Sequence, residues 1–140
     1  MIVWLELAIL LALPFIVVIA FVGFRKMPRR LKVHKYVGDW KQLQNFCKDR
    51  ATWPQALQDA DTLLDQALRR RKYRGNSMGE RLVSAQRKLT DNDSIWTAHN
   101  LTKKIITNPK MRLQESAVKS ALVAYRQALK DLGALPHDKR

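Results

Sequence analysis

The sequence predicts an all-α protein: one N-terminal transmembrane helix followed by an antiparallel bundle of four to five helices. Residues 1–24 form an apolar run, and beyond it apolar residues recur at intervals of three and four, as they do along one face of a helix. No segment alternates apolar and polar residues as a half-buried strand does. The connections between the helical segments are short, which favours antiparallel packing.

The run at residues 1–24 is long enough to cross a bilayer core, which takes about 20 apolar residues in a helix. Sixteen of its residues are Leu, Ile, Val or Phe, and together they favour insertion by roughly 5 to 10 kcal/mol. Glu6, its only charged side chain, lies near the outer end, and a bilayer helix tolerates one proline such as Pro14. A cleaved signal peptide would instead need a basic start, a shorter apolar core and a small-residue cleavage site.

A basic juxtamembrane linker is expected at residues 25–38. Six of its cations are predicted to lie at the membrane surface: Arg25, Lys26, Arg29, Arg30, Lys32 and Lys35. Because positively charged flanks stay in the cytoplasm, they predict an outside N-terminus and a cytoplasmic C-terminal domain. Attraction of each cation to an anionic leaflet contributes about 1 kcal/mol, so anchoring alone accounts for this cluster.

The cytoplasmic bundle is predicted to occupy residues 39–135, and residues 136–140 a flexible tail. Asp39 is expected to cap a first short helix. Thr52 opens a capping-box pattern before a second, strongly amphipathic helix, which Gly75 ends.

Three further amphipathic helices are expected. Ser77 and Glu80 have the spacing of a capping box, a fourth bundle helix covers about 95–107, and the last covers about 114–132 with Gly133 as its stop. Large residues on the apolar faces are expected in the core: Trp53, Leu64, Trp96, Leu122 and Tyr125.

The chain carries 26 Lys and Arg against 12 Asp and Glu, a formal net charge of +14, and every Lys and Arg follows Phe24. Such an excess indicates an anionic partner: nucleic acid, a membrane surface or an acidic protein. A dense run on the second bundle helix, with two lysines further on, predicts a surface that binds nucleic acid or another anion: Arg69, Arg70, Arg71, Lys72, Tyr73, Arg74, Lys103 and Lys104. Tyr73 would stack on a base. The alternatives are lipid contact and a solvated helix end whose cations complement the helix dipole.

Metal and cofactor chemistry find little support. The single cysteine, Cys47, excludes an intramolecular disulfide and a Cys-based zinc site. Asp61 and Asp65 lie one helical turn apart, but no Glu-x-x-His pair accompanies them, so ion pairing with Arg81 or Lys103 is expected in place of a metal site. We expect no cofactor, no metal and no small-molecule substrate.

His99 is the residue most suited to act as a general base. That role needs a carboxylate that orients the ring, and the sequence places none beside it. Since His99 lies near Trp96 on the helical wheel, the sequence favours a hydrogen-bonded interface histidine.

Several short motifs resemble a known family, and they span about residues 40–135. They are Trp53…Ala60-Asp61…Leu64-Asp65, then Met78-Gly-Glu-Arg-Leu82, then Trp96-Thr-Ala-His99, then Ala121…Tyr125…Ala128-Leu129…Leu132-Gly133. They resemble an uncharacterised family of membrane-anchored helical-bundle proteins of candidate-phylum bacteria. That family is in turn similar to the HEPN bundle of nucleotide-binding and RNA-cleaving proteins.

HEPN ribonucleases carry an arginine followed, after four to six residues, by a histidine. The matching positions in this sequence are Thr102 and Thr107. Threonine is neither a base near neutral pH nor a cation for a phosphate. The resemblance therefore implies the helical fold without the RNA-cleaving pair.

The sequence thus predicts a membrane-tethered, non-catalytic scaffold whose basic domain contacts an anionic partner, either RNA or a ribonucleoprotein, or the lipid surface. One alternative is a HEPN-like ribonuclease or nucleotide-binding protein, whose activity would depend on His99. The other is a structural subunit of a membrane protein assembly, which would meet its neighbours through Glu6 and the anchor helix.

Overall fold

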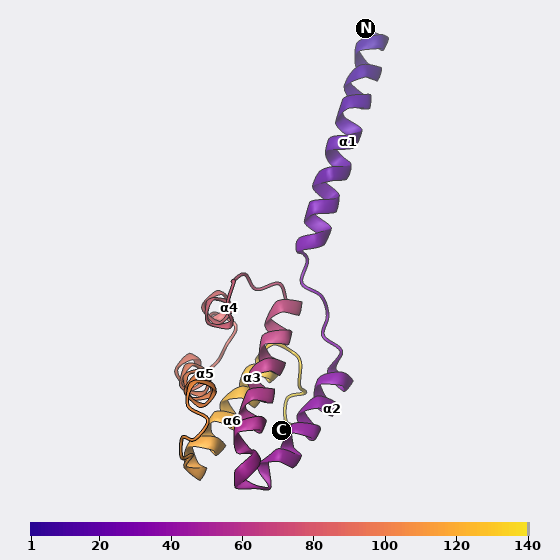
Figure 1. Ribbon diagram of the computed structural model, residues 1–140. Helices are drawn as coiled ribbons and strands as arrows, with labels where there is room; N and C mark the ends of the chain where they lie inside the picture. The colour runs from indigo at the N-terminus through magenta and orange to yellow at the C-terminus, as the bar shows by residue number, and fades with distance from the viewer. Residues whose placement is uncertain (140) are drawn as a thin grey trace.

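The computed structural model describes residues 1–139, and Figure 1 shows one long helix projecting from a bundle of five. The described residues contain no strand, so the predicted all-α class and the five-helix bundle are confirmed. Two short 3-10 turns, Asn45–Cys47 and Arg50–Thr52, join the first two bundle helices. The helices are α1 (Ile2–Lys26), α2 (Val33–Gln44), α3 (Trp53–Arg70), α4 (Met78–Ala85), α5 (Asn92–Thr107) and α6 (Glu115–Asp131).

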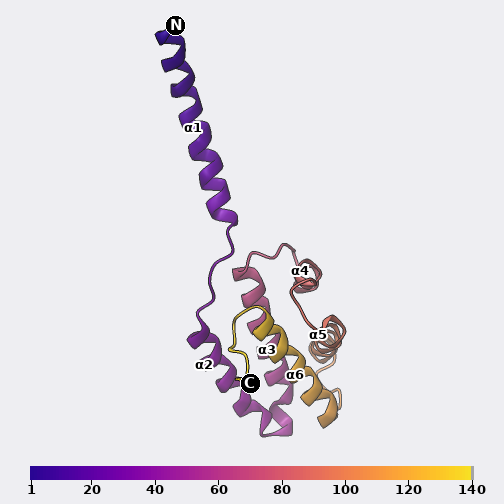
Figure 2. The ribbon, with the colours of Figure 1, turned by 180° about the vertical axis from the view of Figure 1, so that it is seen from behind.

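α1 is long and apolar enough to span a membrane. Its 25 residues give a length of about 37 Å, against a hydrocarbon core of about 30 Å. The mean hydropathy of its most apolar stretch is 3.0, and none of its residues is buried. Figures 1 and 2 show it leaving one end of the bundle without lying against any other helix. A helix apolar on every side requires an apolar environment, which the bundle does not supply.

α3 is the central helix of the bundle. Its apolar stripe is fully enclosed by α2, α4, α5 and α6: Ala56, Leu57, Ala60, Leu63, Leu64, Ala67 and Leu68. α2 runs antiparallel to α3, whereas α3 and α6 run parallel, with their C-terminal ends close together beside the linker (Figures 1 and 2). Of the predicted core residues, Leu64 and Tyr125 are fully buried, and Trp53, Trp96 and Leu122 pack against the core with part of each side chain exposed.

α2 begins at Val33, within the predicted linker, and Asp39 is not its cap. Asp39 lies inside the helix, where its carboxylate accepts a hydrogen bond from Lys35 at 3.0 Å. The helix extends because Tyr36, Trp40 and Leu43 form an apolar stripe that is buried against α3, and burial stabilises a helix more than local propensity does. Only residues 27–32 remain as a linker.

Of the two predicted capping boxes, the structure contains a cap at Ser77 and none at Thr52. Ser77 caps α4 as predicted, since its Oγ accepts from the Glu80 N–H at 3.2 Å. The Glu80 carboxylate accepts from the Asn76 N–H at 2.6 Å, one residue before the expected position. The Thr52 prediction is wrong: its hydroxyl donates to the Phe46 carbonyl at 2.6 Å and so ties the 3-10 turns together without capping α3.

α5 begins three residues earlier than predicted. Asp91 caps it by accepting from the Ser94 N–H at 3.0 Å, so the polar residues 92–94 form its first turn. The tail, predicted to be flexible, is held at Asp138, which accepts from Lys130 Nζ at 2.6 Å. This hydrogen bond and the charge of Lys130 hold the pKa of Asp138 below its usual value.

α3 ends before Gly75, in a Schellman motif that places a lysine in the left-handed region. The Tyr73 N–H donates to the Leu68 carbonyl at 3.1 Å, the Lys72 N–H donates to the Arg69 carbonyl at 3.0 Å, and the φ of Lys72 is 63°. α6 ends in the same motif at Gly133, whose φ is 79°, as predicted for that glycine. The same turn is therefore made once with glycine and once with lysine.

Candidate anion-binding site

The linker and the end of α3 lie side by side. The Arg29 N–H donates to the Arg70 carbonyl at 3.2 Å, which holds the linker across the C-terminal end of α3. Between the linker, α2 and α3 lies an open groove of about 550 Å³, which we call the basic groove. Six cations line it, together with Tyr36 and Gln66: Arg29, Lys32, Lys35, Arg69, Arg70 and Lys72.

The basic groove brings together two clusters of cations that lie far apart in the sequence. Three of its cations were predicted to meet the membrane surface, and the other three were predicted to bind an anionic partner. The sequence shows both runs of charge, but their meeting depends on a hydrogen bond between residues 41 positions apart. No local signal predicts that contact.

Four of the six cations form no ion pair within residues 1–139: Arg29, Lys32, Arg70 and Lys72. Lys35 is paired with Asp39 at 3.0 Å, and Arg69 with Asp65 at 2.9 Å, both on exposed helix surface. Burial raises the pKa of the Tyr36 hydroxyl, and this outweighs the opposite effect of Lys35 and Arg70. The hydroxyl therefore stays protonated near neutral pH, and the groove is positively charged with neutral donors beside the charges.

The other predicted binding residues lie outside this groove. Arg71 lines a second basic groove, of about 500 Å³, on the α6 side of the linker, with Arg30, Lys88, Lys130 and His137. Tyr73 packs against the hydrophobic core, which removes part of the ring from the stacking role predicted for it. Arg74 is exposed in the loop after α3, and Arg25 and Lys26 are exposed at the end of α1.

Lys103 and Lys104 are exposed on α5 and do not join the arginine run. Lys104 lines a different groove, of about 480 Å³, between α5 and α6. The structure thus divides the predicted surface into a part at the end of α3 and a part on α5.

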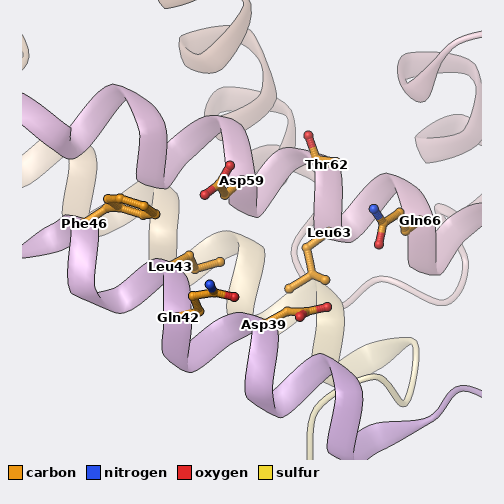
Figure 3. Close-up of a pocket in the computed structure, with 8 residues that line it drawn as sticks. All are labelled: Asp39, Gln42, Leu43, Phe46, Asp59, Thr62, Leu63 and Gln66. Atoms are coloured by element: carbon orange, nitrogen blue, oxygen red, sulfur yellow. The ribbon is translucent and has the colours of Figure 1, made fainter.

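The acidic end of the α2–α3 groove limits the positive region. A hollow of about 340 Å³ lies further along the same two helices. Figure 3 shows two of its lining residues, Asp39 on α2 and Asp59 on α3, on opposite sides of it. Gln66 lines both this hollow and the basic groove, so the two are adjacent. From Arg70 to Asp59 is about 16 Å along α3. Between α2 and α3, the lysines and arginines therefore line the part nearest the linker, and the two aspartates line the part further from it.

The structure identifies the partners of Asp61 and Asp65, which could not be chosen from their spacing in the sequence. Asp65 accepts from Arg81 Nε at 2.7 Å, which confirms the predicted ion pair, and Arg81 is only 5% exposed. Asp61 binds neither Arg81 nor Lys103 in the described part of the chain. Its Oδ1 lies 2.8 Å from His99 Nδ1 and accepts from the Tyr125 hydroxyl at 2.7 Å.

His99 therefore has the orienting carboxylate that the sequence could not place, because Asp61 lies 38 residues away on another helix. The Thr102 hydroxyl lies 2.8 Å from that of Tyr125, so the polar cluster links α3, α5 and α6 inside the bundle. Burial and the charge of Asp61 raise the pKa of Tyr125 far above its usual value. Tyr125 is thus a permanent hydrogen-bond donor to Asp61.

The two threonines, Thr102 and Thr107, both form hydrogen bonds within the bundle. Thr102 is buried in this cluster, and the Thr107 hydroxyl donates to the Lys103 carbonyl at 2.6 Å. His99 is itself 7% exposed and lies edge-on to Trp96, with ring centroids 6.1 Å apart. The cluster therefore offers an oriented histidine, and no Lys or Arg among residues 1–139 forms a hydrogen bond or ion pair with its members His99, Asp61, Tyr125 and Thr102.

Comparison with protein-family models, with curated proteins and with solved structures gave no match for this chain.

Proposed function

We propose that the protein is a membrane-tethered, non-catalytic binding protein, with its N-terminus outside and its basic bundle on the cytoplasmic side of a bacterial inner membrane. The single observation that carries this proposal is the basic groove at the end of the bundle nearest α1. Its partner is an anionic surface or molecule at that membrane.

The energetics support attraction to a membrane surface. The four groove cations without an ion pair contribute together about 4 kcal/mol near an anionic leaflet, at about 1 kcal/mol each. A free energy of that size corresponds to about three orders of magnitude in affinity. The four groove cations therefore favour the lipid surface, and the exposed Lys103 and Lys104 remain available to RNA or a ribonucleoprotein.

A HEPN-like enzyme is a second proposal, and the Asp61–His99 pair is the observation that favours it. A carboxylate that orients a histidine is one part of a general-base site. The threonines at the two HEPN-equivalent positions argue against RNA cleavage. This proposal predicts a ribonuclease activity that His99→Gln abolishes.

The third reading, a structural subunit of a membrane assembly, would draw support from apolar surface on the bundle. Large apolar side chains are exposed singly on four bundle helices: Val33 on α2, Val83 on α4, Ile106 on α5 and Val123 on α6. One residue per helix is ordinary for a soluble surface and favours no partner.

The test uses the full chain in zwitterionic nanodiscs, titrated with a labelled single-stranded RNA over a salt series. If four cations contact phosphates, the logarithm of the binding constant should fall with the logarithm of salt concentration with a slope of about −3. Adding anionic lipid to the nanodisc should displace RNA if both use the groove. Absence of any response to RNA and to anionic lipid would overturn the proposal, and RNA cleavage that depends on His99 would replace it with the enzyme.

A further inference from the structure

We propose that the basic groove is a binding site for the headgroup of a phospholipid that carries two phosphates, supplied by the leaflet in which α1 ends. This inference rests on the proposed membrane topology and deepens it, because it names the ligand of the groove. It concerns a defined site between the linker, α2 and α3, as distinct from a general attraction to negative surfaces.

The first argument is reach. The last residue of α1, Lys26, is three residues from Arg29, whose backbone is fixed to the end of α3. Three residues span at most about 10 Å. The groove therefore lies close to the level at which α1 leaves the membrane, at a distance similar to the Debye length of about 8 Å at physiological ionic strength. A headgroup phosphate is the anion nearest to it.

The second argument is the composition of the groove. Two arginines, Arg29 and Arg70, and two lysines, Lys32 and Lys72, have no ion-pair partner within residues 1–139. A guanidinium binds a phosphate through two parallel hydrogen bonds, and an ammonium adds a compact charge. The Tyr36 hydroxyl and the Gln66 amide supply neutral donors beside them. Two pairs of cations provide the charge to balance two phosphates, as basic pockets between transmembrane helices do when they bind headgroups of this kind.

The third argument is the backbone of Lys72. Its φ of 63° lies in the left-handed region, where glycine is the usual residue at the end of a helix. α6 makes the same motif with Gly133. Lysine at this position places an ammonium at the groove, although a non-glycine residue in the left-handed region costs conformational energy. Such strained residues are concentrated at binding sites.

The extent of positive charge favours a compact ligand over RNA. A nucleic-acid strand that followed the α2–α3 groove away from the membrane would pass Asp39 and Asp59 within about 16 Å of Arg70. Single-strand binding grooves follow the phosphates of several nucleotides with positive charge along their length. A headgroup with two phosphates fits the short positive region and leaves the acidic hollow unoccupied.

The experiment uses the full chain in nanodiscs of two compositions with equal total surface charge. One contains cardiolipin, which has two phosphates, and the other phosphatidylglycerol, which has one. Lipid retained by the protein after mild release from the nanodisc is counted by native mass spectrometry. The groove variant is Arg70→Gln/Lys72→Gln, and the matched control is Lys103→Gln/Lys104→Gln, which removes the same charge from α5.

We expect the wild type and the control to retain cardiolipin in preference to phosphatidylglycerol. The groove variant should lose roughly 25-fold in apparent affinity, about fivefold for each cation. Lys72→Gly should lose about fivefold without a lower melting temperature, which separates loss of the side chain from loss of the fold.

Three results would overturn the inference. Equal losses in the groove variant and the control would show attraction to surface charge alone, and the proposed function would stand. Binding of inorganic pyrophosphate to the protein in zwitterionic nanodiscs, as tight as that of cardiolipin, would identify a soluble diphosphate as the ligand. RNA binding that the groove variant abolishes, with no retained lipid, would assign the groove to RNA. A fourth result, no binding of either RNA or anionic lipid by the wild type, would refute both the inference and the proposed function.

Discussion

Asp65 accepts hydrogen bonds from two arginines in opposite environments, and this arrangement allows a sharp test of how the end of α3 is stabilised. The side chain of Arg69 is 65% exposed and that of Arg81 is 6% exposed. Arg81 also donates from Nη1 to the Gly75 carbonyl at 2.7 Å. Its guanidinium thus links α3, α4 and the loop between them.

Asp65→Ala should lower the free energy of unfolding by about 3 to 5 kcal/mol, because it leaves the buried charge of Arg81 without its counterion. Arg69→Gln removes the exposed arginine from the same carboxylate and should cost about 1 kcal/mol or less. Urea denaturation of the full chain in detergent micelles, followed by tryptophan fluorescence, measures both. Trp53 and Trp96 report on the bundle because both pack against its core.

The single variant Arg81→Met and the double variant Asp65→Ala/Arg81→Met complete a double-mutant cycle on this pair. Since methionine removes the buried charge, the double variant should be more stable than Asp65→Ala alone, by about 1 kcal/mol or more. The reasoning would be refuted if Arg69→Gln cost as much as Asp65→Ala, or if the second substitution destabilised the protein further. Either result would show that the interaction between Asp65 and Arg81 does not govern stability at this end.

Three further predictions concern single residues. Tyr125→Phe should cost about 1 to 3 kcal/mol, since the half-buried Asp61 carboxylate loses a donor. Because the pKa of Tyr125 is raised on folding, its contribution is complete below about pH 10 and falls as the pH rises above that value, so urea midpoints on both sides of pH 10 should show a smaller alkaline loss in the variant. Lys72→Gly should leave the unfolding free energy unchanged or raise it by up to about 1 kcal/mol, whereas Gly133→Lys should lower it by about 1 kcal/mol. If both substitutions lowered or both raised the unfolding free energy, left-handed strain at Lys72 would be contradicted. Gly75→Ala should destabilise the protein by about 2 kcal/mol or more, as measured by thermal melting, because the new Cβ would lie 2.7 Å from the backbone nitrogen of Arg81 at a φ of 156°. Gly38→Ala lies inside α2, where a new Cβ meets nothing within 4 Å, and it should stabilise the protein by about 1 kcal/mol; a loss of stability there would contradict the helix assignment.

The features that the sequence predicts correctly are local ones. The Ser77 cap depends on residues within one helical turn, and the Gly133 stop on the intrinsic conformational freedom of glycine. The apolar stripe of α3 follows from the spacing of leucine and alanine alone. Such signals require no knowledge of the rest of the chain.

The features that the sequence misses depend on tertiary contacts. The start of α2 follows from burial of Tyr36, which outweighs the break that Gly38 indicates. The orientation of His99 requires Asp61 from another helix, and the basic groove requires the hydrogen bond between Arg29 and Arg70. Charge and residue type were visible in each case, but the partners were not, because they are brought together only by packing of the helices.

The connection between α1 and the bundle is short, and this determines how tightly the groove must bind a headgroup in order to be occupied. With Arg29 held to Arg70, only Met27 and Pro28 separate the two parts of the chain. A tether of this length gives an effective ligand concentration in the millimolar range or above. A headgroup site with an intrinsic dissociation constant near 1 mM would therefore be substantially occupied in the membrane. The same bundle released from its anchor would bind that headgroup only weakly.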